Sequence, residues 1–541
     1  MSTAGSRARH PDESVVGTLQ SLIVAFVLAM TFRGFVTEGF VIPTGSMAPT
    51  LLGKNIRIHS TQTGWDFPLG VDQDQRKVDA RFLRDPMLGP EYRGAVSSEP
   101  QPPIRMGDRI LVLKSLFPFS RPSRFDVVVF KNPTNPNGED GNYIKRLVGL
   151  PNESIWLVDG DVFTTATKDA DDWSSYGIQR KPEHVQRAVW QPVQNADFIP
   201  VRPGDLSADT PYRGAPWEGG EWDTTGRQYR CDTAERTTLG WEPRFREIND
   251  WASYNMLLPS GRAQERVPTH DVRVAAALIP DADGLATTLE ITGRKTIFRY
   301  ELKDDKIRLS LCLVEFMEHA LSWEDLGEFE FDGFAAGRAT NVEFWHVDQS
   351  LAVFVDGKRV AYGEYDWKPE ERTLRAATRE ADFERLAAID AGESTVLRWH
   401  FEGSPLSIDR VRLARDLYYR TGLLSAGAHR NPTNAGFESI VDLSHPTLRG
   451  RPAFGTHPAN LAKLGPDHFF MLGDNSTASS DSRLWGNPHP LVAVQIDPSP
   501  FVVHRDLLLG KAWVVYFPAP HSITPGGRAL IPDFGGLRFI R

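Results

Sequence analysis

The chain contains only two cysteines, Cys231 and Cys312, among its 541 residues. So small a number excludes a disulfide-rich scaffold and a zinc site built from cysteine thiolates. The two thiols lie far apart in sequence, and both a bond between them and two buried free thiols stay open. The sequence also lacks the H-E-x-x-H pattern of a metalloprotease helix. We therefore expect neither a metal nor a cofactor in its chemistry.

An excess of basic residues is also lacking. The 61 lysines and arginines are outnumbered by 70 aspartates and glutamates, which gives a formal net charge of -9. A nucleic-acid partner would require a basic surface, so DNA and RNA are excluded as partners. With 40% hydrophobic and 24% charged residues the composition is globular, and the length predicts two or three folded units.

Long hydrophobic runs are rare as well, and only one stretch could reach across a bilayer. The segment SVVGTLQSLIVAFVLAMTF, from Ser14 to Phe32, carries no charge. As a helix it would measure about 28 Å, close to the hydrocarbon thickness of a membrane. We expect residues 1–34 to form a cytoplasmic tail and a single transmembrane anchor. No clear small-x-small site follows the run, which disfavours a cleaved signal peptide. A buried soluble helix is the alternative, because Gln20 and the threonines dilute the stretch.

The segments after the anchor have the alternating pattern of strands. Three of them are clear: Arg109–Lys114, Asp126–Lys131 and Tyr143–Gly149. No long amphipathic helix intervenes, so these strands predict an antiparallel, β-rich unit. The polar stretch at residues 55–103 predicts a long loop or a small subdomain.

The composition changes from Phe163 to Thr447, where most of the fourteen tryptophans lie. Short alternating runs recur there, and Asp356-Gly357 between two apolar runs predicts a hairpin. This pattern is typical of a β-sandwich, and Asn341–Gly363 resembles the strand pair of laminin-G or concanavalin-like jelly rolls. The last hundred residues again resemble the first part of the chain. The expected fold is thus mainly β, with a β domain in two parts (35–160 and 448–541) and an inserted jelly-roll-like sandwich (161–447).

A candidate nucleophile, Ser46, lies in the segment PTGSMAP (Pro43–Pro49). Gly45 permits a close backbone approach, and the flanking prolines stiffen the loop. A serine on such a loop can be held for attack with its own N–H directed at a developing oxyanion. By itself the segment is also an ordinary Pro/Gly turn, so Ser46 needs a base to become a site.

Lys145 is the candidate base, in the mostly apolar strand YIKRLV (Tyr143–Val148). A free lysine, with a pKa of about 10.4, costs about 4.6 kcal/mol to hold neutral at pH 7. Burial against apolar walls lowers that pKa by several units and produces a general base. The alternative is a solvent-facing lysine on an amphipathic strand. None of the fourteen histidines lies in a recognisable nucleophile or orienting motif, which disfavours a histidine-based triad.

Taken together, several segments resemble the type I signal peptidases, the Ser-Lys enzymes that release exported proteins from their signal peptides. In the family's order, the segments are FRGFVTEGFVIPTGSMAPTLLG (Phe32–Gly53), GDRILVLK (Gly107–Lys114), FDVVVFKNP (Phe125–Pro133), NYIKRLVGLPNESI (Asn142–Ile155), FFMLGDNSTASSDSRLWG (Phe469–Gly486) and GKAWVVYFP (Gly510–Pro518). They all precede Gly160 or follow Leu464, which leaves the tryptophan-rich region outside the likeness.

The resemblance implies that Ser46 attacks the scissile carbonyl while Lys145 takes its proton. It implies an oxyanion hole made of the Ser46 N–H and the Thr44 hydroxyl. Ser479 falls where the family has a serine that orients the lysine. A further pair of residues would brace the site as an ion pair that holds a loop: Asp481 and Arg483.

The resemblance also implies a substrate pocket. Counterparts of five residues line shallow apolar subsites, which would accept the methyl groups of an Ala-x-Ala sequence and clash with larger side chains. These residues are Phe40, Ile42, Met47, Val129 and Ile144.

Two departures from the family pattern stand out. Ser476-Thr477-Ala478 replaces the common Arg-Asp-Asn, which removes polar contacts from the loop that carries Ser479. Phe125 stands where glycine usually precedes the aspartate of the second strand segment. Neither departure removes a catalytic group.

The expectation is therefore a serine endopeptidase that cleaves signal peptides from exported preproteins and contacts membrane lipid. It would cross the cytoplasmic (inner) membrane once, with its catalytic part on the extracytoplasmic side. The insert would fold alone, be dispensable for bond cleavage, and bind a glycan or a protein partner. Two alternatives stay open: a membrane-anchored glycan-binding protein with an inactive peptidase part, and a soluble lectin-like protein with an export signal.

Overall fold

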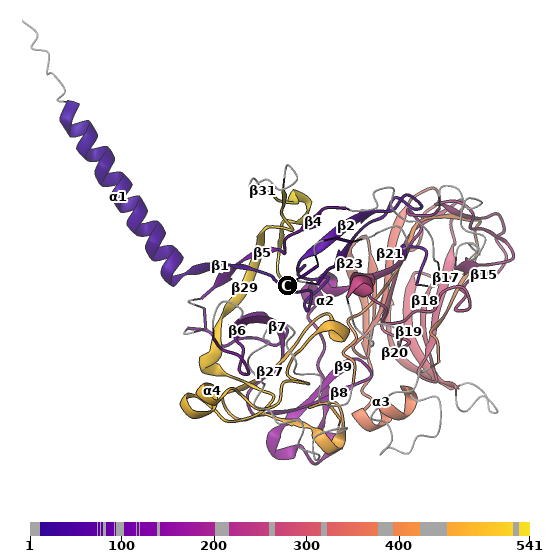
Figure 1. Cartoon of the computed structure of the whole chain (residues 1–541). Helices are drawn as coiled ribbons and strands as arrows, with labels where there is room; N and C mark the ends of the chain where they lie inside the picture. The colour runs from indigo at the N-terminus through magenta and orange to yellow at the C-terminus, as the bar shows by residue number, and fades with distance from the viewer. Residues whose placement is uncertain are drawn as a thin grey trace, which may run out of the picture.

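The computed structural model describes residues 11–541 apart from 73, 76, 79–82, 91, 93–101, 115, 118, 138–140, 201–215, 259–265, 315–321, 377–392, 422–451 and 523–529. Strands dominate this part of the chain, and they pair antiparallel (Figure 1). This confirms the mainly β expectation. Residues 1–10 of the predicted tail, and the predicted boundary after Thr447, lie outside the described residues. The α-helices are α1 (Pro11–Phe35), α2 (Glu183–Val189), α3 (Pro369–Ala376) and α4 (Pro490–Gln495).

One sheet, which we call the site sheet, combines strands from the two ends of the chain. Its order is β1-β5-β29-β6-β7-β27-β28, and β32 pairs with β29. β29 separates β5 from β6, so the last part of the chain completes a sheet that the first part begins. The three clearest predicted strands are confirmed as β5, β6 and β7. The bounds are β1 (Thr37–Val41), β5 (Arg109–Leu113), β6 (Val127–Lys131), β7 (Asn142–Gly149), β27 (His468–Leu472), β28 (Val503–His504), β29 (Leu508–Phe517) and β32 (Arg538–Phe539).

Three smaller sheets are formed by strands that lie between those of the site sheet along the chain, and the smallest of them pairs β30 with β31. One has the order β10-β9-β8-β26, so residues 161–178 pair with strands that flank the tryptophan-rich region. Another, β3-β2-β4, gives the stretch after Asn55 a small apolar core of its own. The bounds are β2 (Asn55–His59), β3 (Asp66–Gly70), β4 (Ile104–Arg105), β8 (Glu153–Val158), β9 (Asp161–Ala166), β10 (Gly177–Ile178), β26 (Ala462–Lys463), β30 (His521–Ser522) and β31 (Leu530–Ile531).

Two larger sheets form the region from Gln191 to Arg415, which we call the added region. The first has the order β13-β14-β25-β16-β21-β22-β23, with β11 beside β25, and the second has the order β12-β15-β24-β17-β18-β19-β20. The bounds in the first are β11 (Gln191–Asn195), β13 (Trp222–Asp223), β14 (Tyr229–Cys231), β16 (Val272–Pro280), β21 (Thr340–Val347), β22 (Ser350–Val355), β23 (Lys358–Glu364) and β25 (Leu406–Arg415). Those in the second are β12 (Trp217–Glu218), β15 (Thr237–Trp241), β17 (Ala286–Gly293), β18 (Thr296–Lys303), β19 (Lys306–Leu313), β20 (Trp323–Glu330) and β24 (Val396–Glu402).

Alternating side chains of these two sheets share one apolar core. Along β18, Phe298, Tyr300 and Leu302 are buried between less buried neighbours, the period expected of a strand with one inward face. Asp356 and Gly357 both have positive φ, 47° and 80°, and join β22 to β23. This confirms the predicted hairpin. The assignment of the two packed sheets to a jelly roll stays a prediction. Cys231 on β14 and Cys312 on β19 are buried free thiols.

Helix α1 projects from the body of the protein and leads into β1 (Figure 1). Its apolar side chains are exposed along the run; Leu22, Phe26 and Leu28 are each 64% exposed. Within the described residues, however, no helix combines the length and the apolar character needed to cross a membrane. The predicted transmembrane anchor is therefore not confirmed.

Buried ion pairs join the added region to the turn between β8 and β9. Asp159, at that turn, accepts hydrogen bonds from Arg294 at 2.5 Å and from Arg372 at 3.0 Å. Asp161 accepts another from Arg372 at 2.6 Å. Burial opposes the ionisation of Asp159, but the charges of Arg294 and Arg372 outweigh it and hold the pKa of Asp159 below its usual value. Arg294 follows β17 and Arg372 lies in α3, so these pairs fix the two parts against each other.

We expect Asp159→Ala to lower the free energy of unfolding by about 3–5 kcal/mol, because it leaves two buried guanidinium groups short of a counter-charge. Urea unfolding followed by tryptophan fluorescence measures the loss. The control is Asp171→Ala, since Asp171 pairs with Lys463 but is 91% exposed, and this change should leave the midpoint unaltered. Equal midpoints for both variants would contradict the structural role of Asp159.

Candidate active site

The loop after β1 presents Ser46 on a tight turn. The Ala48 N–H donates to the Gly45 carbonyl at 3.0 Å, and the Leu51 N–H donates to the Met47 carbonyl at 2.9 Å. Ser46 is 8% exposed. A Cβ atom at Gly45 would lie 2.1 Å from the ring of Tyr254. Gly45 therefore allows the close contact that the sequence predicted, here between the backbone and the Tyr254 ring. A larger residue would force the loop and the ring apart.

Lys145 on β7 lies directly beside this serine. Its Nζ atom is 2.7 Å from Ser46 Oγ and donates to the Ile144 carbonyl at 3.1 Å. The lysine is 3% exposed, and burial lowers its pKa to about 8. The carboxylates of Asp481 and Asp474 act in the opposite direction, and Arg483 adds to the lowering. A lysine with this pKa is partly neutral near pH 7 and can accept a proton from the serine hydroxyl.

The next residue, Arg146, forms a buried pair that sequence reasoning missed. Its Nε and Nη2 atoms donate to the two carboxylate oxygens of Asp474 at 2.7 and 2.6 Å, and both side chains are fully buried. The Thr50 hydroxyl also donates to Asp474. Asp474 thus links β7 to the loop of the serine. Part of the signal was present in the sequence, since Arg146 is a second cation within an apolar strand and Asp474 lies two residues after the end of β27.

Phe125, which departs from the family's glycine, has a φ of 69°. This left-handed conformation favours glycine, and an L side chain there costs about 1–2 kcal/mol. The ring is 3% exposed in a core with Val148 and Leu472, so its burial offsets the backbone cost. The Phe125 carbonyl accepts a hydrogen bond from Arg146 at 2.8 Å, and the departure therefore leaves the site intact.

The loop after β27 brings Ser479, Asp481 and Arg483 close to the dyad. Ser479 is 7% exposed, and its Oγ has no hydrogen-bond partner in the described part of the chain, so its orienting role stays a prediction. Asp481 and Arg483 form an ion pair at 2.7 Å. Asp481 also accepts from the Gly473 N–H at 3.1 Å, and Arg483 donates to the Ser476 hydroxyl at 2.7 Å. The pair thus holds both ends of the loop, the arrangement expected of a brace.

The two expected oxyanion donors, Thr44 and Ser46, are separated by one residue in the chain. Thr44 is exposed and Ser46 follows Gly45 at the turn. Across the residues that the structure describes, neither the Thr44 hydroxyl nor the Ser46 N–H has a hydrogen-bond partner. Both donors are thus free to bind a ligand, and an oxyanion hole requires such free donors. Their catalytic role stays a prediction.

The five predicted pocket residues gather in one apolar cluster beside the serine. Four of them are almost fully buried, with exposed fractions between 0% and 9%, whereas Phe40 is half-buried. Two members of the cluster, Met47 and Ile144, directly adjoin Ser46 and Lys145 in the chain, which places the cluster beside the dyad. The structure places most of the surface of the five residues in the core, so a contact with substrate stays a prediction for each.

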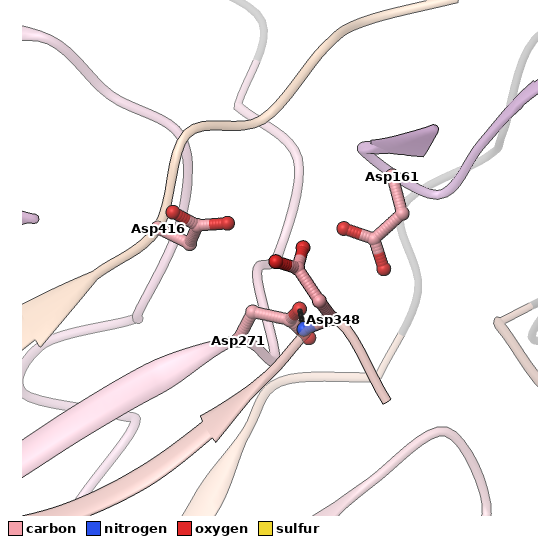
Figure 2. A group of neighbouring side chains, drawn as sticks. All are labelled: Asp161, Asp271, Asp348 and Asp416. Atoms are coloured by element: carbon pink, nitrogen blue, oxygen red, sulfur yellow. Dashed lines mark hydrogen bonds between the residues drawn. The ribbon is translucent and has the colours of Figure 1, made fainter. Parts of the chain in front are cut away.

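Four aspartates elsewhere in the chain converge in space (Figure 2). Their ligand oxygens lie within 4.8 Å of one another, close enough to surround a cation; the residues are Asp161, Asp271, Asp348 and Asp416. Lys181 already lies among them, with its Nζ atom 2.5 Å from Asp348 and 2.8 Å from Asp416. Burial raises the pKa of Asp416 to about 6 and, together with the charge of Asp271, the pKa of Asp161 well above its usual value. The cluster belongs to the ion pairs that join the added region to β8 and β9.

Comparison with known proteins gives one family match. Residues 15–202 match the profile of a family described as "Signal peptidase, peptidase S26", a range that includes Ser46 and Lys145. A relative named signal peptidase I from Rickettsia bellii is 27% identical over 149 residues, which cover 28% of this chain and 39% of that protein. One of the same name from Pseudomonas aeruginosa is 26% identical over 166 residues, covering 29% and 43%. The chain thus spans less than half the length of these relatives.

Some solved structures also resemble part of the chain. A carbohydrate-binding module, CBM66, from Bacillus subtilis is 10% identical, with a TM-score of 0.21, and the match covers 37% of this chain and 97% of that one. Sheep galectin-11 is 13% identical, with a TM-score of 0.18 and coverage of 27% and 92%. Scores this low support no conclusion about this chain.

The reactivity of Ser46 should follow the protonation of Lys145. Because only the neutral amine accepts the serine proton, acylation of Ser46 by an activated ester should accelerate as the pH rises through about 8. Below pH 7 the rate should fall about tenfold per pH unit. Mass spectrometry of the Ser46 peptide measures the rate, and Lys145→Met, which holds no proton acceptor, is the control. A rate that keeps rising well beyond pH 9 would show a lysine with an ordinary pKa.

Proposed function

We propose that this chain, which matches the signal peptidase family S26 over residues 15–202 and carries a large additional region, is a serine endopeptidase with a Ser46–Lys145 dyad. The observation that carries the proposal is the 2.7 Å contact between Ser46 Oγ and the Nζ atom of a lysine that is 3% exposed. A charged lysine loses most of its hydration in such a place, which lowers the pKa and makes the neutral form accessible near pH 7.

In the proposed reaction, Lys145 Nζ takes the hydroxyl proton as Ser46 Oγ attacks the scissile carbonyl carbon. The negative charge on the carbonyl oxygen is met by the Ser46 N–H and the Thr44 hydroxyl. When the tetrahedral intermediate collapses, the C–N bond breaks and the amine takes the proton from the Lys145 ammonium. A water molecule, deprotonated by Lys145, then hydrolyses the acyl-enzyme and returns the serine to its free form.

Two buried ion pairs keep the lysine available as a base. Asp474 and Asp481 would stabilise an ammonium at Lys145 if their charges were unpaired. Arg146 neutralises Asp474, and Arg483 neutralises Asp481, at distances of 2.6 and 2.7 Å. Ser479 lies in the same loop, and we propose that its hydroxyl orients Lys145 when substrate excludes water from the site.

We propose that the substrates are the signal peptides of exported preproteins, cut after Ala-x-Ala-type sequences. The support is the apolar cluster beside the dyad, whose small exposed surface would suit methyl groups better than larger side chains. Its five members are Phe40, Ile42, Met47, Val129 and Ile144.

We also propose that the protein crosses the cytoplasmic membrane once through α1, with its body on the extracytoplasmic side. The uncharged run from Ser14 to Phe32 and its exposed side chains support this placement. The site sheet adds a second apolar surface beside β1. Its exposed members on β1, β29 and β32 include Val41, Trp513, Tyr516 and Phe539. Lipid contact would remove both surfaces from water.

The glycan-binding alternative requires exposed rings in the tryptophan-rich region, because a sugar stacks on an aromatic face. Most of the tryptophan side chains there are less than 10% exposed and pack in cores, so they offer no aromatic platform to a sugar. They are Trp190, Trp217, Trp222, Trp241, Trp345, Trp367 and Trp399. We therefore propose the peptidase function alone.

The test is to incubate the detergent-solubilised protein with a preprotein and to map the cut by mass spectrometry. Ser46→Ala should lower the rate by about 10³-fold or more. Lys145→Arg should be as inactive as Lys145→Ala, because a guanidinium stays charged and accepts no proton. The control Lys463→Arg, at an exposed ion pair, should cleave normally, and EDTA should change nothing. A near-normal rate for Lys145→Arg, or loss with EDTA and rescue by zinc, would refute the Ser–Lys mechanism.

Membrane attachment has its own test. The full chain should sediment with membranes and resist extraction by alkaline carbonate. Val24→Arg places a charge in the middle of the run, at a cost of about 2.5–3.5 kcal/mol, and should increase the extracted fraction. Val494→Arg is the matched control, since Val494 is 86% exposed on α4. Complete extraction of the unchanged chain by carbonate would disprove a spanning α1.

A further inference from the structure

A short 3₁₀ helix of the added region, η5 (Ser253–Leu257), reaches the loop of the candidate nucleophile. Tyr254 lies against two glycines there. A Cβ atom would be 2.1 Å from its ring at Gly45 and 2.3 Å from it at Gly70. The tyrosine is 5% exposed, so its ring fills the space between the serine loop and β3. The residue directly before Ser46 therefore packs against a part of the chain that lies outside the family resemblance.

The next residue, Asn255, connects η5 to the same loop through hydrogen bonds. The two side-chain amides form a pair of hydrogen bonds, because Nδ2 of Asn255 donates to Oδ1 of Asn475 and Nδ2 of Asn475 donates to Oδ1 of Asn255, both at 2.7 Å. Asn255 also donates to the Thr477 hydroxyl at 2.8 Å. Asn255 is 4% exposed and Asn475 is 4% exposed, so water does not compete for these bonds.

Asn475 in turn holds the backbone of the nucleophile. Its side chain donates to the Gly45 carbonyl at 2.9 Å, and its backbone N–H donates to the Ser46 carbonyl at 3.1 Å. The Gly45 carbonyl and the Ser46 N–H belong to one planar peptide unit and point in opposite directions. A bond that fixes the Gly45 carbonyl therefore also aims the Ser46 N–H, the proposed oxyanion donor.

The other contacts of η5 keep this chain of bonds in place. Met256 and Leu257 pack against the apolar core of the β2–β3 hairpin, beside Ile58 and Phe67. Upstream of η5, Arg246 donates to the Met87 carbonyl at 2.6 Å. The element is thus fixed by packing on one side and by the two amide groups on the other.

We propose that η5 of the added region is part of the peptidase site, with Asn255 as a positioning residue that orients the Gly45–Ser46 peptide through Asn475. The proposal rests on the proposed peptidase function and deepens it. It opposes the expectation that the added region is dispensable for bond cleavage. Because an aligned Ser46 N–H matters most when the oxyanion forms, the loss of Asn255 should affect kcat and leave KM nearly unchanged.

The experiment compares Asn255→Ala with the unchanged full chain in detergent, using a short Ala-x-Ala peptide. We expect kcat to fall about tenfold to a hundredfold and KM to stay within about twofold. The matched control is Asn341→Ala, since Asn341 bonds to Asp356 within the added region. Asn475→Ala with and without Asn255→Ala completes a cycle. The double variant should be no slower than Asn475→Ala alone, because both act through one bond.

Hydrogen exchange of the peptide covering Pro43–Gly53 supplies a readout that does not depend on cleavage. Asn255→Ala should speed exchange in this loop, whereas Asn341→Ala should not. If Asn255→Ala does not fold, Asn255→Ser is measured in its place, since a hydroxyl cannot form the paired amide bonds. Normal kcat with unchanged loop exchange would overturn the proposal. If the unchanged chain fails to cleave, the proposed function falls, and loop exchange still decides whether Asn255 positions Ser46.

Discussion

The site depends on keeping one lysine out of water beside one serine. Lys145 comes from β7 near the middle of the site sheet, where it pairs with Val128 of β6 and follows Ile144, a member of the apolar cluster. This burial is the largest influence on the pKa of Lys145 and lowers it to about 8. A more hydrated lysine at the same distance from Ser46 would stay charged and could not act as a base.

The surrounding charges are arranged so that they do not cancel this effect. Two carboxylates, Asp474 and Asp481, lie near the lysine and favour its charged form. Each is bound by an arginine at hydrogen-bond distance, Arg146 and Arg483 respectively. The two ion pairs therefore hold the loops in place, and within each pair the arginine offsets the charge of the aspartate. Because removing one partner of a buried pair leaves an uncompensated charge, each arginine serves the fold and the lysine together.

The added region is attached to the rest of the molecule at more than one place. At one end, arginines of the added region form ion pairs with Asp159 and Asp161. At another, η5 contacts the loop that carries Ser46. An inserted domain held only at its two chain connections would move freely relative to its host. Buried ion pairs and packed side chains on separate surfaces restrict that motion, so the two parts of the chain form one framework around Ser46.

Local sequence patterns were enough to predict three strands of the site sheet and to single out Ser46 and Lys145 as candidate reacting groups. Alternation of apolar residues located β5, β6 and β7, and the Asp356-Gly357 turn located a hairpin, because both signals depend on near neighbours in the chain. The serine loop and the lysine strand were recognisable as short contiguous segments. Phe125 was noticed as a departure from glycine, but only its φ of 69° showed why glycine is usual there.

Contacts between residues far apart in the chain became visible only in the folded structure. The partnership of Arg146 with Asp474 spans more than half of the sequence, and the amide pair of Asn255 and Asn475 crosses from the added region to the site. Arg146 is conspicuous as a cation within an apolar strand, but no local pattern shows which distant residue it binds, and none marks the amide pair. The burial that lowers the pKa of Lys145 is likewise a property of the packed sheet and its loops. Contacts between distant segments are set by how the sheets pack, and only the folded chain reveals them.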